Sequence, residues 1–169
     1  MKIKIIFLFI FLFVAGLSFG QLKIGYVDSD TILKKMPDAI DAKTKIDASI
    51  AEWNEELRKI EQQLKDKKDD FEKRKLIMSE QTRTDLEKEI FALDKQIVEY
   101  KQKKFGVNGE LFKKQEELMK PVQNRVFNAI QEVAKEKELD YIFDRSGDII
   151  FLFAKPEYDY TNIVLEKLK

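Results

Sequence analysis

The chain has 169 residues, of which 37% are charged, and its 31 Lys and Arg residues equal its 31 Asp and Glu residues. This balance excludes the strong basic field that is typical of nucleic-acid binding. The chain contains no cysteine and no histidine. Disulfide stapling is therefore excluded, and the usual zinc ligands, the commonest general base and the thiol nucleophile are absent. A carboxylate pair or a serine with a lysine would still allow catalysis, but no pattern indicates one, so we expect no enzyme and no cofactor.

Residues 1–20 have the pattern of a secretory signal peptide. Lys2 and Lys4 precede an uninterrupted apolar run over residues 5–14, and small residues lead up to Gly20. The run is shorter than the roughly 20 residues of a bilayer span, so a permanent anchor is the less favoured alternative. No cysteine follows the cleavage site, which excludes a lipoprotein anchor. We expect cleavage after Gly20 and an exported mature chain with 29 basic and 31 acidic residues, a net charge of −2.

The mature chain opens with a short strand and a short helix. Residues 23–27 contain the β-branched Ile24 and Val27 and the aromatic Tyr26, which predicts a strand that ends at Asp28. Asp28, Ser29 and Asp30 are candidate N-caps for a helix over residues 31–35. Pro37 is then compatible with the first turn of a longer helix, because its missing N–H has no partner there.

Two apolar heptad tracks dominate the centre of the chain. Within each track the apolar residues follow one another at steps of three, four or seven residues. The first track consists of Ile46, Ile50, Trp53, Leu57, Ile60, Leu64 and Phe71, and the second of Leu86, Ile90, Leu93, Ile97, Tyr100, Val107, Leu111 and Leu118. A seven-residue repeat predicts a left-handed coiled coil. Because about fifteen residues separate the tracks, an antiparallel hairpin over residues 38–120 is favoured, about 60 Å long. Its tip is expected near residues 76–84, with Ser79 or Thr84 as the cap of the returning helix.

Three residues interrupt the returning helix. Gly106 and Gly109 lie inside the apolar pattern, where each costs about 1 kcal/mol relative to alanine. Pro121 removes a backbone hydrogen bond and should bend the helix, which then resumes to about Glu138. We treat Gly106, Gly109 and Pro121 as candidate hinges, with Pro121 as an elbow between arm and body. The alternative for the glycines is close helix contact.

The C-terminal part again resembles a small sheet. Strand-like runs cover residues 140–144 and 148–154, with a tight turn between them, and a last helix is expected over residues 161–168. The fold class is therefore α+β, mainly α, with a β-rich body from residues 21–37 and 121–169. So small a sheet is marginal alone, and the run 149–153 is apolar on both faces, so we expect the bodies to associate. The candidate association surface is Ile24, Tyr26, Val27, Ile142, Phe143, Ile149, Phe151 and Phe153.

These parts resemble a known family in their order along the mature chain. The matching segments are Gly25-Tyr26-Val27-Asp28-Ser29, Met36-Pro37, the Lys-, Glu- and Gln-rich hairpin, Met119-Lys120-Pro121-Val122, Asp140-Tyr141-Ile142-Phe143-Asp144, Tyr158-Asp159-Tyr160-Thr161 and Val164-Leu165-Glu166. They resemble the Skp (OmpH-like) periplasmic chaperones. The resemblance implies a trimeric jellyfish architecture, in which three coiled-coil arms enclose a cavity that holds unfolded outer-membrane proteins without ATP. The arms of described family members are strongly basic, and this chain departs from that pattern.

A second apolar line on the returning helix suggests where a client binds. Its members are spaced by seven residues and lie beside the seam: Phe91, Val98, Phe105, Phe112 and Met119. The outgoing helix has no such line, so the returning helix has a wider apolar face than its partner needs. We interpret the line as a client-binding surface. The alternative is a broadened core within the hairpin or against the body, which is favoured for Phe112 and Met119.

Two further alternatives concern the whole arm. The cations of residues 65–75 are interleaved with acidic residues, which favours a solvated surface of ion pairs over weak contact between the arm tips and an anionic membrane. A structural coiled-coil spacer or adaptor is the alternative to a chaperone. The wide aromatic face favours the chaperone, because a spacer gains nothing from exposing it.

Overall fold

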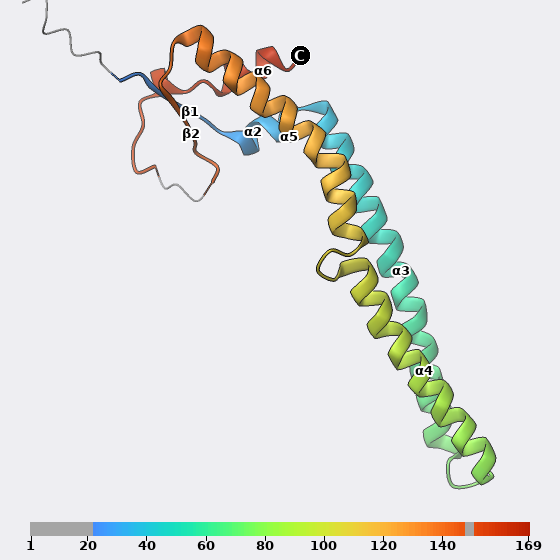
Figure 1. Ribbon diagram of the computed structural model, residues 1–169. Helices are drawn as coiled ribbons and strands as arrows, with labels where there is room; N and C mark the ends of the chain where they lie inside the picture. Colours follow the sequence, from blue (N-terminus) through green and yellow to red (C-terminus); the bar gives the residue numbers. More distant parts are fainter. Residues whose placement is uncertain (1–21, 148–150) are drawn as a thin grey trace, which may run out of the picture.

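A computed structural model describes residues 22–147 and 151–169, and it consists of a long helical hairpin that projects from a small body (Figure 1). The outgoing helix is α3 (Pro37–Arg74), and the chain returns through α4 (Glu80–Phe105) and α5 (Glu110–Lys137). The predicted signal peptide lies outside the described residues. Within the described ranges, no helix combines the length and hydropathy of a membrane span.

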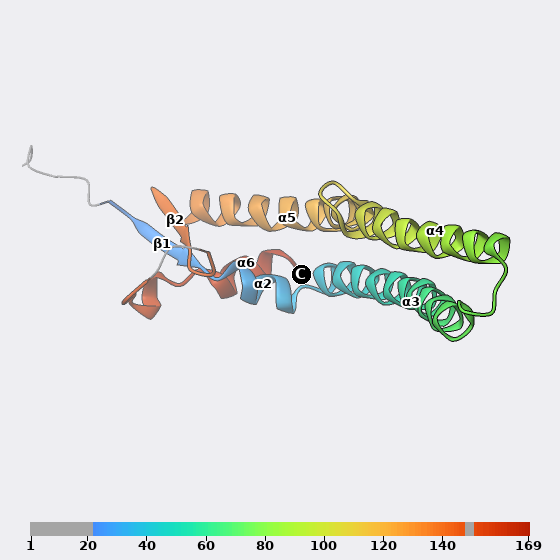
Figure 2. The same cartoon turned by 90° about the horizontal axis from the view of Figure 1, so that it is seen from below.

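The hairpin is held by the apolar track of α3. Figure 2 shows α3 lying along α4 and α5 over its length, and α3 packs against both helices. Ile46, Trp53 and Leu57 are buried on the side of α3 that faces them, and Ile97 is buried on α4. Further towards the tip, Leu64 and Phe71 are only half-buried. With 38 residues, α3 is about 57 Å long, close to the predicted reach.

The tip of the hairpin is a five-residue connection from Lys75 to Ser79. Ser79 is the N-cap of α4, since its Oγ accepts a hydrogen bond from the backbone N–H of Thr82 at 3.2 Å. Of the two predicted caps, Ser79 is therefore confirmed, and the returning helix begins before Thr84. The neighbouring Leu76 and Ile77 are 93% and 83% exposed.

The returning limb is two helices, where the heptad pattern predicted one. Helix α4 ends at Phe105, and α5 begins at Glu110. Between them, Gly109 N–H donates to Gly106 O at 2.9 Å, and Asn108 has a φ of 60°. Val107, which the pattern placed on the seam, is 88% exposed, so that prediction is wrong. The physical reason is that the loop places residues 106–109 beside the helices instead of in line with them (Figures 1 and 2).

Helix α5 connects the arm to the body without a second break. It runs through Pro121 as one helix, and its buried residues beyond that point are Val122, Val126, Ala129 and Val133. These residues join the core of the body, whereas the first turns of α5 accompany α3. The helix ends at Lys137, and Glu138 follows it as a left-handed C-cap with a φ of 52°.

The body is built around two parallel strands. β1 (Ile24–Val27) pairs with β2 (Tyr141–Asp144), with Ile24 opposite Tyr141 and Val27 opposite Asp144. Parallel strands need a crossover connection, and here the whole helical hairpin forms it. Helix α2 (Ser29–Lys35) follows β1 and is capped by Asp28, while α6 (Thr161–Lys167) closes the chain. The centre of the core consists of Val27, Ile32, Val133 and Val164, each at most 1% exposed.

The predicted C-terminal β-hairpin does not form in the described residues. Asp148–Ile150 lies outside them, Phe151–Ala154 has no strand, and the described sheet has two strands. The second edge of β1 is used by a later segment, because Tyr160 N–H donates to Tyr26 O at 2.9 Å and Tyr26 bridges to Asp159. A short 3-10 helix, η1 (Pro156–Tyr158), precedes this contact.

Candidate client-binding and association surfaces

Phe91 and Val98 form an exposed apolar strip on α4. Phe91 is 71% exposed and Val98 is 66% exposed, although Ile97, next to Val98 in sequence, is 8% exposed against α3. Two residues seven apart lie on the same side of a helix, so Phe91 and Val98 share a face that α3 does not cover. A shallow pocket of about 430 Å³ adjoins Phe91 and is also lined by Phe71 and Ile90. The side chains that the sequence predicted for client contact are therefore accessible at these two positions.

Phe105, the next member of the predicted line, packs inside the hairpin instead. Its ring meets the indole of Trp53 on α3 edge-on, with centroids 6.0 Å apart and planes at 76°. Trp53 is 8% exposed, and Phe105 is half-buried. Of the two interpretations of Phe105, the core assignment fits this geometry. The sequence signal was present in Trp53, the one tryptophan of the chain, which lies on the seam of α3.

The last two members of the line lie on α5 and differ from each other. Phe112 is 46% exposed, so it extends the accessible apolar surface beyond the break. Met119 is half-buried and packs against the core of the body. It also lines a groove of about 910 Å³ at the base of the arm, together with Leu33 and Ile40. Of the five residues of the predicted line, Phe91, Val98 and Phe112 are therefore exposed, whereas Phe105 and Met119 pack against other parts of the chain.

Charged and aromatic side chains surround the break between α4 and α5. Lys104 Nζ lies 4.8 Å from the centroid of the Trp53 ring and 2.5 Å from Glu110 Oε2. The hydrogen bond from Lys104 is the main reason why the pKa of Glu110 is lowered from its ordinary value. One turn earlier, Tyr100 donates its hydroxyl to Glu56 on α3 at 2.5 Å. Burial, followed by this hydrogen bond, raises the pKa of Tyr100.

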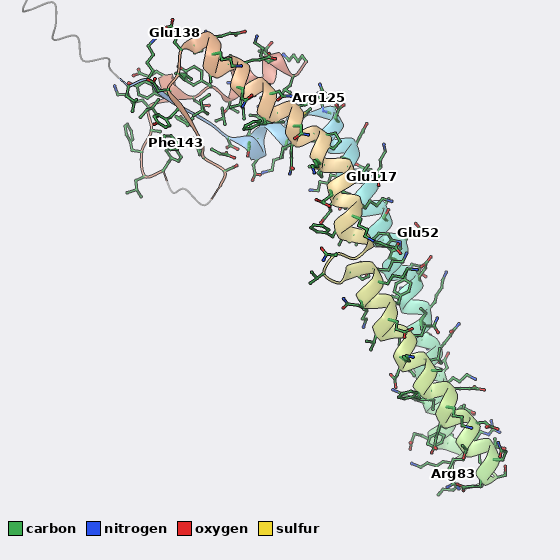
Figure 3. All side chains as sticks on the ribbon, viewed as in Figure 1. Glu52, Arg83, Glu117, Arg125, Glu138 and Phe143 are labelled. Atoms are coloured by element: carbon green, nitrogen blue, oxygen red, sulfur yellow. The ribbon has the colours of Figure 1, made fainter. Side chains whose placement is uncertain are left out.

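The sheet of the body has an accessible aromatic side. Ile24 is 42% exposed, Phe143 is 36% exposed and Phe153 is 82% exposed. Phe151 packs on Phe143, with centroids 6.3 Å apart, and on Tyr26 at 5.8 Å. Figure 3 shows Phe143 at the sheet end of the body, far from Arg83 at the tip. These side chains would suit contact with another chain.

Not all residues of the predicted association surface are available. Tyr26 and Val27 are 5% and 1% exposed within the single chain, so their side chains belong to its own core and their placement on the surface is wrong. Ile142 is half-buried against that core, and Ile149 lies outside the described residues. Sequence reasoning missed Tyr141, which is 57% exposed and stacks on Phe143 with centroids 6.3 Å apart. The alternation of side chains along β2 would have identified it.

A polar cluster fixes the end of the sheet. The carboxylate of Asp144 accepts hydrogen bonds from the Ser29 hydroxyl at 2.5 Å and the Ser146 hydroxyl at 2.8 Å, and from both backbone N–H groups. Burial would raise the pKa of Asp144, but these hydrogen bonds outweigh it and the pKa is lowered. Because Asp144 ends β2 and Ser29 begins α2, these hydrogen bonds link the two elements. In the part of the chain that the structure describes, no group of acidic side chains has the arrangement of a metal site.

The charges near the tip are largely paired. Arg74 contacts Asp70 at 2.9 Å, and Lys75 contacts Glu72 at 2.5 Å. Lys68 reaches across to Asp94 on α4 at 3.1 Å. This arrangement fits the solvated surface of ion pairs that the sequence favoured. The apolar pair Leu76 and Ile77 was missed, because it lies just beyond the last residue of the heptad track.

Comparison with known proteins gives two matches to this architecture. The family model described as "Outer membrane protein (OmpH-like)" matches residues 23–168. A crystal structure of an OmpH-like protein from Caulobacter crescentus CB15, for which a role as an outer membrane chaperone is suggested, is similar with a TM-score of 0.69. The two sequences are 15% identical, and the alignment covers 88% of this chain and 85% of the other. None of the curated proteins compared gives a match.

Proposed function

Because the chain belongs to the OmpH-like family of outer membrane proteins, we propose that it is an ATP-independent holdase chaperone of the periplasm. Its clients are unfolded outer-membrane proteins, which it shields from aggregation in a cavity between helical arms. The suggested chaperone role of the Caulobacter crescentus relative supports this proposal. The absence of a phosphate-cradling glycine loop from the sequence is consistent with a nucleotide-free mechanism.

The exposed pair of Phe91 and Val98 carries the proposal. Both side chains are mostly accessible, although Ile97 on another face of α4 is buried against α3. An apolar surface that the described part of the chain leaves uncovered is typical of a binding site, and its side chains suit segments of many shapes. Covering one such side chain contributes on the order of 1.5–3 kcal/mol, so a single contact is weak. Several arms acting on one client would raise the avidity.

Association of three protomers through the sheet side of the body would bring the arms together. The accessible Phe143 and Phe153 support such an interface, because a lone chain leaves both in contact with water. In a closed trimer the three arms extend in the same direction from one joined body. The client line of each arm would then face a shared cavity. Export through the predicted signal peptide would place this assembly in the periplasm.

Weak contact between the arm tips and an anionic membrane surface is a secondary proposal. The observation that favours it is the exposure of Leu76 and Ile77 at the far end of the arm. Cosedimentation of wild type and L76S/I77S with anionic vesicles tests it. Equal binding of the two proteins would contradict a role of the tip.

A structural spacer is the alternative function, and aggregation assays separate it from a holdase. An unfolded β-barrel membrane protein is diluted into buffer without nucleotide, and light scattering is followed with wild type, F91S/V98S or K88S/Q96S. The last variant changes two exposed polar residues of the same helix. We expect wild type and K88S/Q96S to suppress scattering and F91S/V98S to be clearly weaker at an unchanged melting temperature. Equal suppression by all three proteins would contradict the proposed site, and none by wild type would favour the spacer.

A further inference from the structure

The sequence around residues 106–109 favours a continuous helix by its apolar pattern, whereas the structure has a loop there. Val107 follows Tyr100 by seven residues, and Leu111 and Leu118 continue the same apolar track. The sequence therefore contains a complete seam for one uninterrupted returning helix. The structure instead places residues 106–109 in a loop, in which Val107 is 88% exposed. The loop thus leaves unused a residue that a continuous helix would bury on the seam.

The two glycines permit the loop and weaken the helix. A Cβ atom on Gly106 would lie 2.4 Å from Gln102 O, and one on Gly109 would lie 2.9 Å from Lys103 O. Any other residue at these positions would force the loop to shift. In a continuous helix the same positions would be unstrained, and there glycine is disfavoured relative to alanine. Asn108 also permits the loop, because asparagine tolerates a φ of 60° better than most residues do.

Few contacts join α4 to α5 across the break. Gly109 N–H donates to Gly106 O, and Lys104 pairs with Glu110 across the break at 2.5 Å. Several links between α4 and α3 are ion pairs of accessible side chains, such as Lys101 with Glu61 at 2.7 Å and Lys68 with Asp94 at 3.1 Å. Accessible pairs of this kind contribute little and re-form readily with other partners. The apolar seam of α3 also repeats every three or four residues, so α4 could be seated one step along it.

We propose that residues 106–109 form a register joint, which switches between the observed loop and an added turn of helix that fuses α4 with α5. Four residues in helical conformation add about 6 Å to the returning limb. Helices α5 and α3 are both anchored in the body, α5 by Val122, Val126 and Val133, so only α4 moves outward along α3, and the connection of residues 75–79 takes up the shift. The returning limb thereby has two lengths. This joint extends the limb along its axis, unlike a hinge, and it does not depend on the proposed function.

Distances across the joint test the proposal in the full mature protein. The chain has no cysteine, so spin labels can be introduced at Gln96 on α4 and Asn124 on α5, which are both exposed. Labelled protein is diluted with unlabelled protein, and the distance is measured by double electron–electron resonance. A control pair at Lys113 and Asn124 lies wholly within α5. The double variant G106A/G109A removes the glycines that permit the loop.

We expect G106A/G109A to lengthen the distance between positions 96 and 124 by about 6 Å, with an unchanged control pair and about four more helical residues by circular dichroism. An unchanged distance in a folded G106A/G109A overturns the proposal. If that variant does not fold, the distances in wild type and N108G are compared instead, because glycine at position 108 favours the loop. A minor longer distance in wild type that N108G abolishes supports the joint. One distance that is identical in wild type and N108G overturns it.

Discussion

The indole ring of Trp53 on α3 and the phenyl ring of Phe105 at the end of α4 meet edge-on, with centroids 6.0 Å apart. This contact lies beside the break in the returning limb, and Lys104 covers the same indole at 4.8 Å. Edge-to-face aromatic pairs contribute about 0.5–1.5 kcal/mol beyond the burial of their area. The pair therefore stabilises the observed register of α4 on α3 at the point where α4 separates from α5.

Replacing Phe105 with alanine should destabilise the hairpin. We expect a loss of about 1–3 kcal/mol in the free energy of unfolding, less than for a fully buried phenylalanine because Phe105 is half-buried. Urea denaturation followed by circular dichroism measures it. The matched control is F91A, since Phe91 is 71% exposed on the same helix and its loss should leave the midpoint nearly unchanged. Similar midpoints for the two variants would mean that the contact with Trp53 contributes nothing.

Two exposed aromatic residues should control association of the bodies. We expect F143S/F153S to lower the mass of the assembly at a protein concentration at which wild type is associated, because the variant removes apolar area from the proposed interface. Analytical ultracentrifugation measures this mass. F127S is the control, because Phe127 is 59% exposed on α5 but lies outside the sheet. An assembly of unchanged mass in F143S/F153S, or dissociation of F127S as well, would place the interface elsewhere.

Acid should weaken the body through Asp144. Its pKa is lowered in the folded chain from an ordinary value of 3.8, despite its partial burial, by hydrogen bonds from Ser29 and Ser146. A carboxylate with a depressed pKa stabilises the fold above its unfolded pKa, and the contribution is lost as the pH falls through the folded pKa. We therefore expect the urea concentration at the unfolding midpoint of wild type to decrease when the pH is lowered below about 4. D144N should be less stable than wild type at neutral pH.

The difference between wild type and D144N should also shrink as the pH is lowered. S29A is the control for the hydrogen bond alone, since it retains the carboxylate. A gap between wild type and D144N that is constant from neutral pH to about pH 3 would mean that the charge of Asp144 is not what stabilises this link.

The hairpin was predictable from the sequence because one simple periodicity specifies it. The spacing of Ile46, Trp53 and Leu57 identified the buried side of α3, and one of the two candidate caps, Ser79, begins α4. The break at Gly106 was not predictable in this way. The seam continues through Val107, and only the close approach of the Gly106 and Gly109 backbones to Gln102 and Lys103 shows why a loop forms.

The body was less predictable, because short strands do not specify their partners. The apolar and aromatic run predicted a strand over residues 140–144, but the pairing of β1 with β2 and the use of its other edge by Asp159 depend on contacts distant in sequence. The sequence also does not distinguish whether Val27 is buried in the core of its own chain or in an interface with another chain. On the arm, periodicity placed Phe91 and Phe105 on one line, and only the position of Trp53 separates their roles.

Four phenylalanines allow the most direct test of the client-binding line. Replacing Phe91, Phe105, Phe112 or Phe127 in turn with the photo-reactive benzoylphenylalanine reports contact with a bound, unfolded β-barrel protein at matched side chains. We expect strong cross-linking from positions 91 and 112, which are exposed on the line. Weak cross-linking is expected from position 105, which packs on Trp53, and from position 127, which lies off the line. Cross-linking from position 127 that equals that from position 91, or none from position 91, would contradict the account.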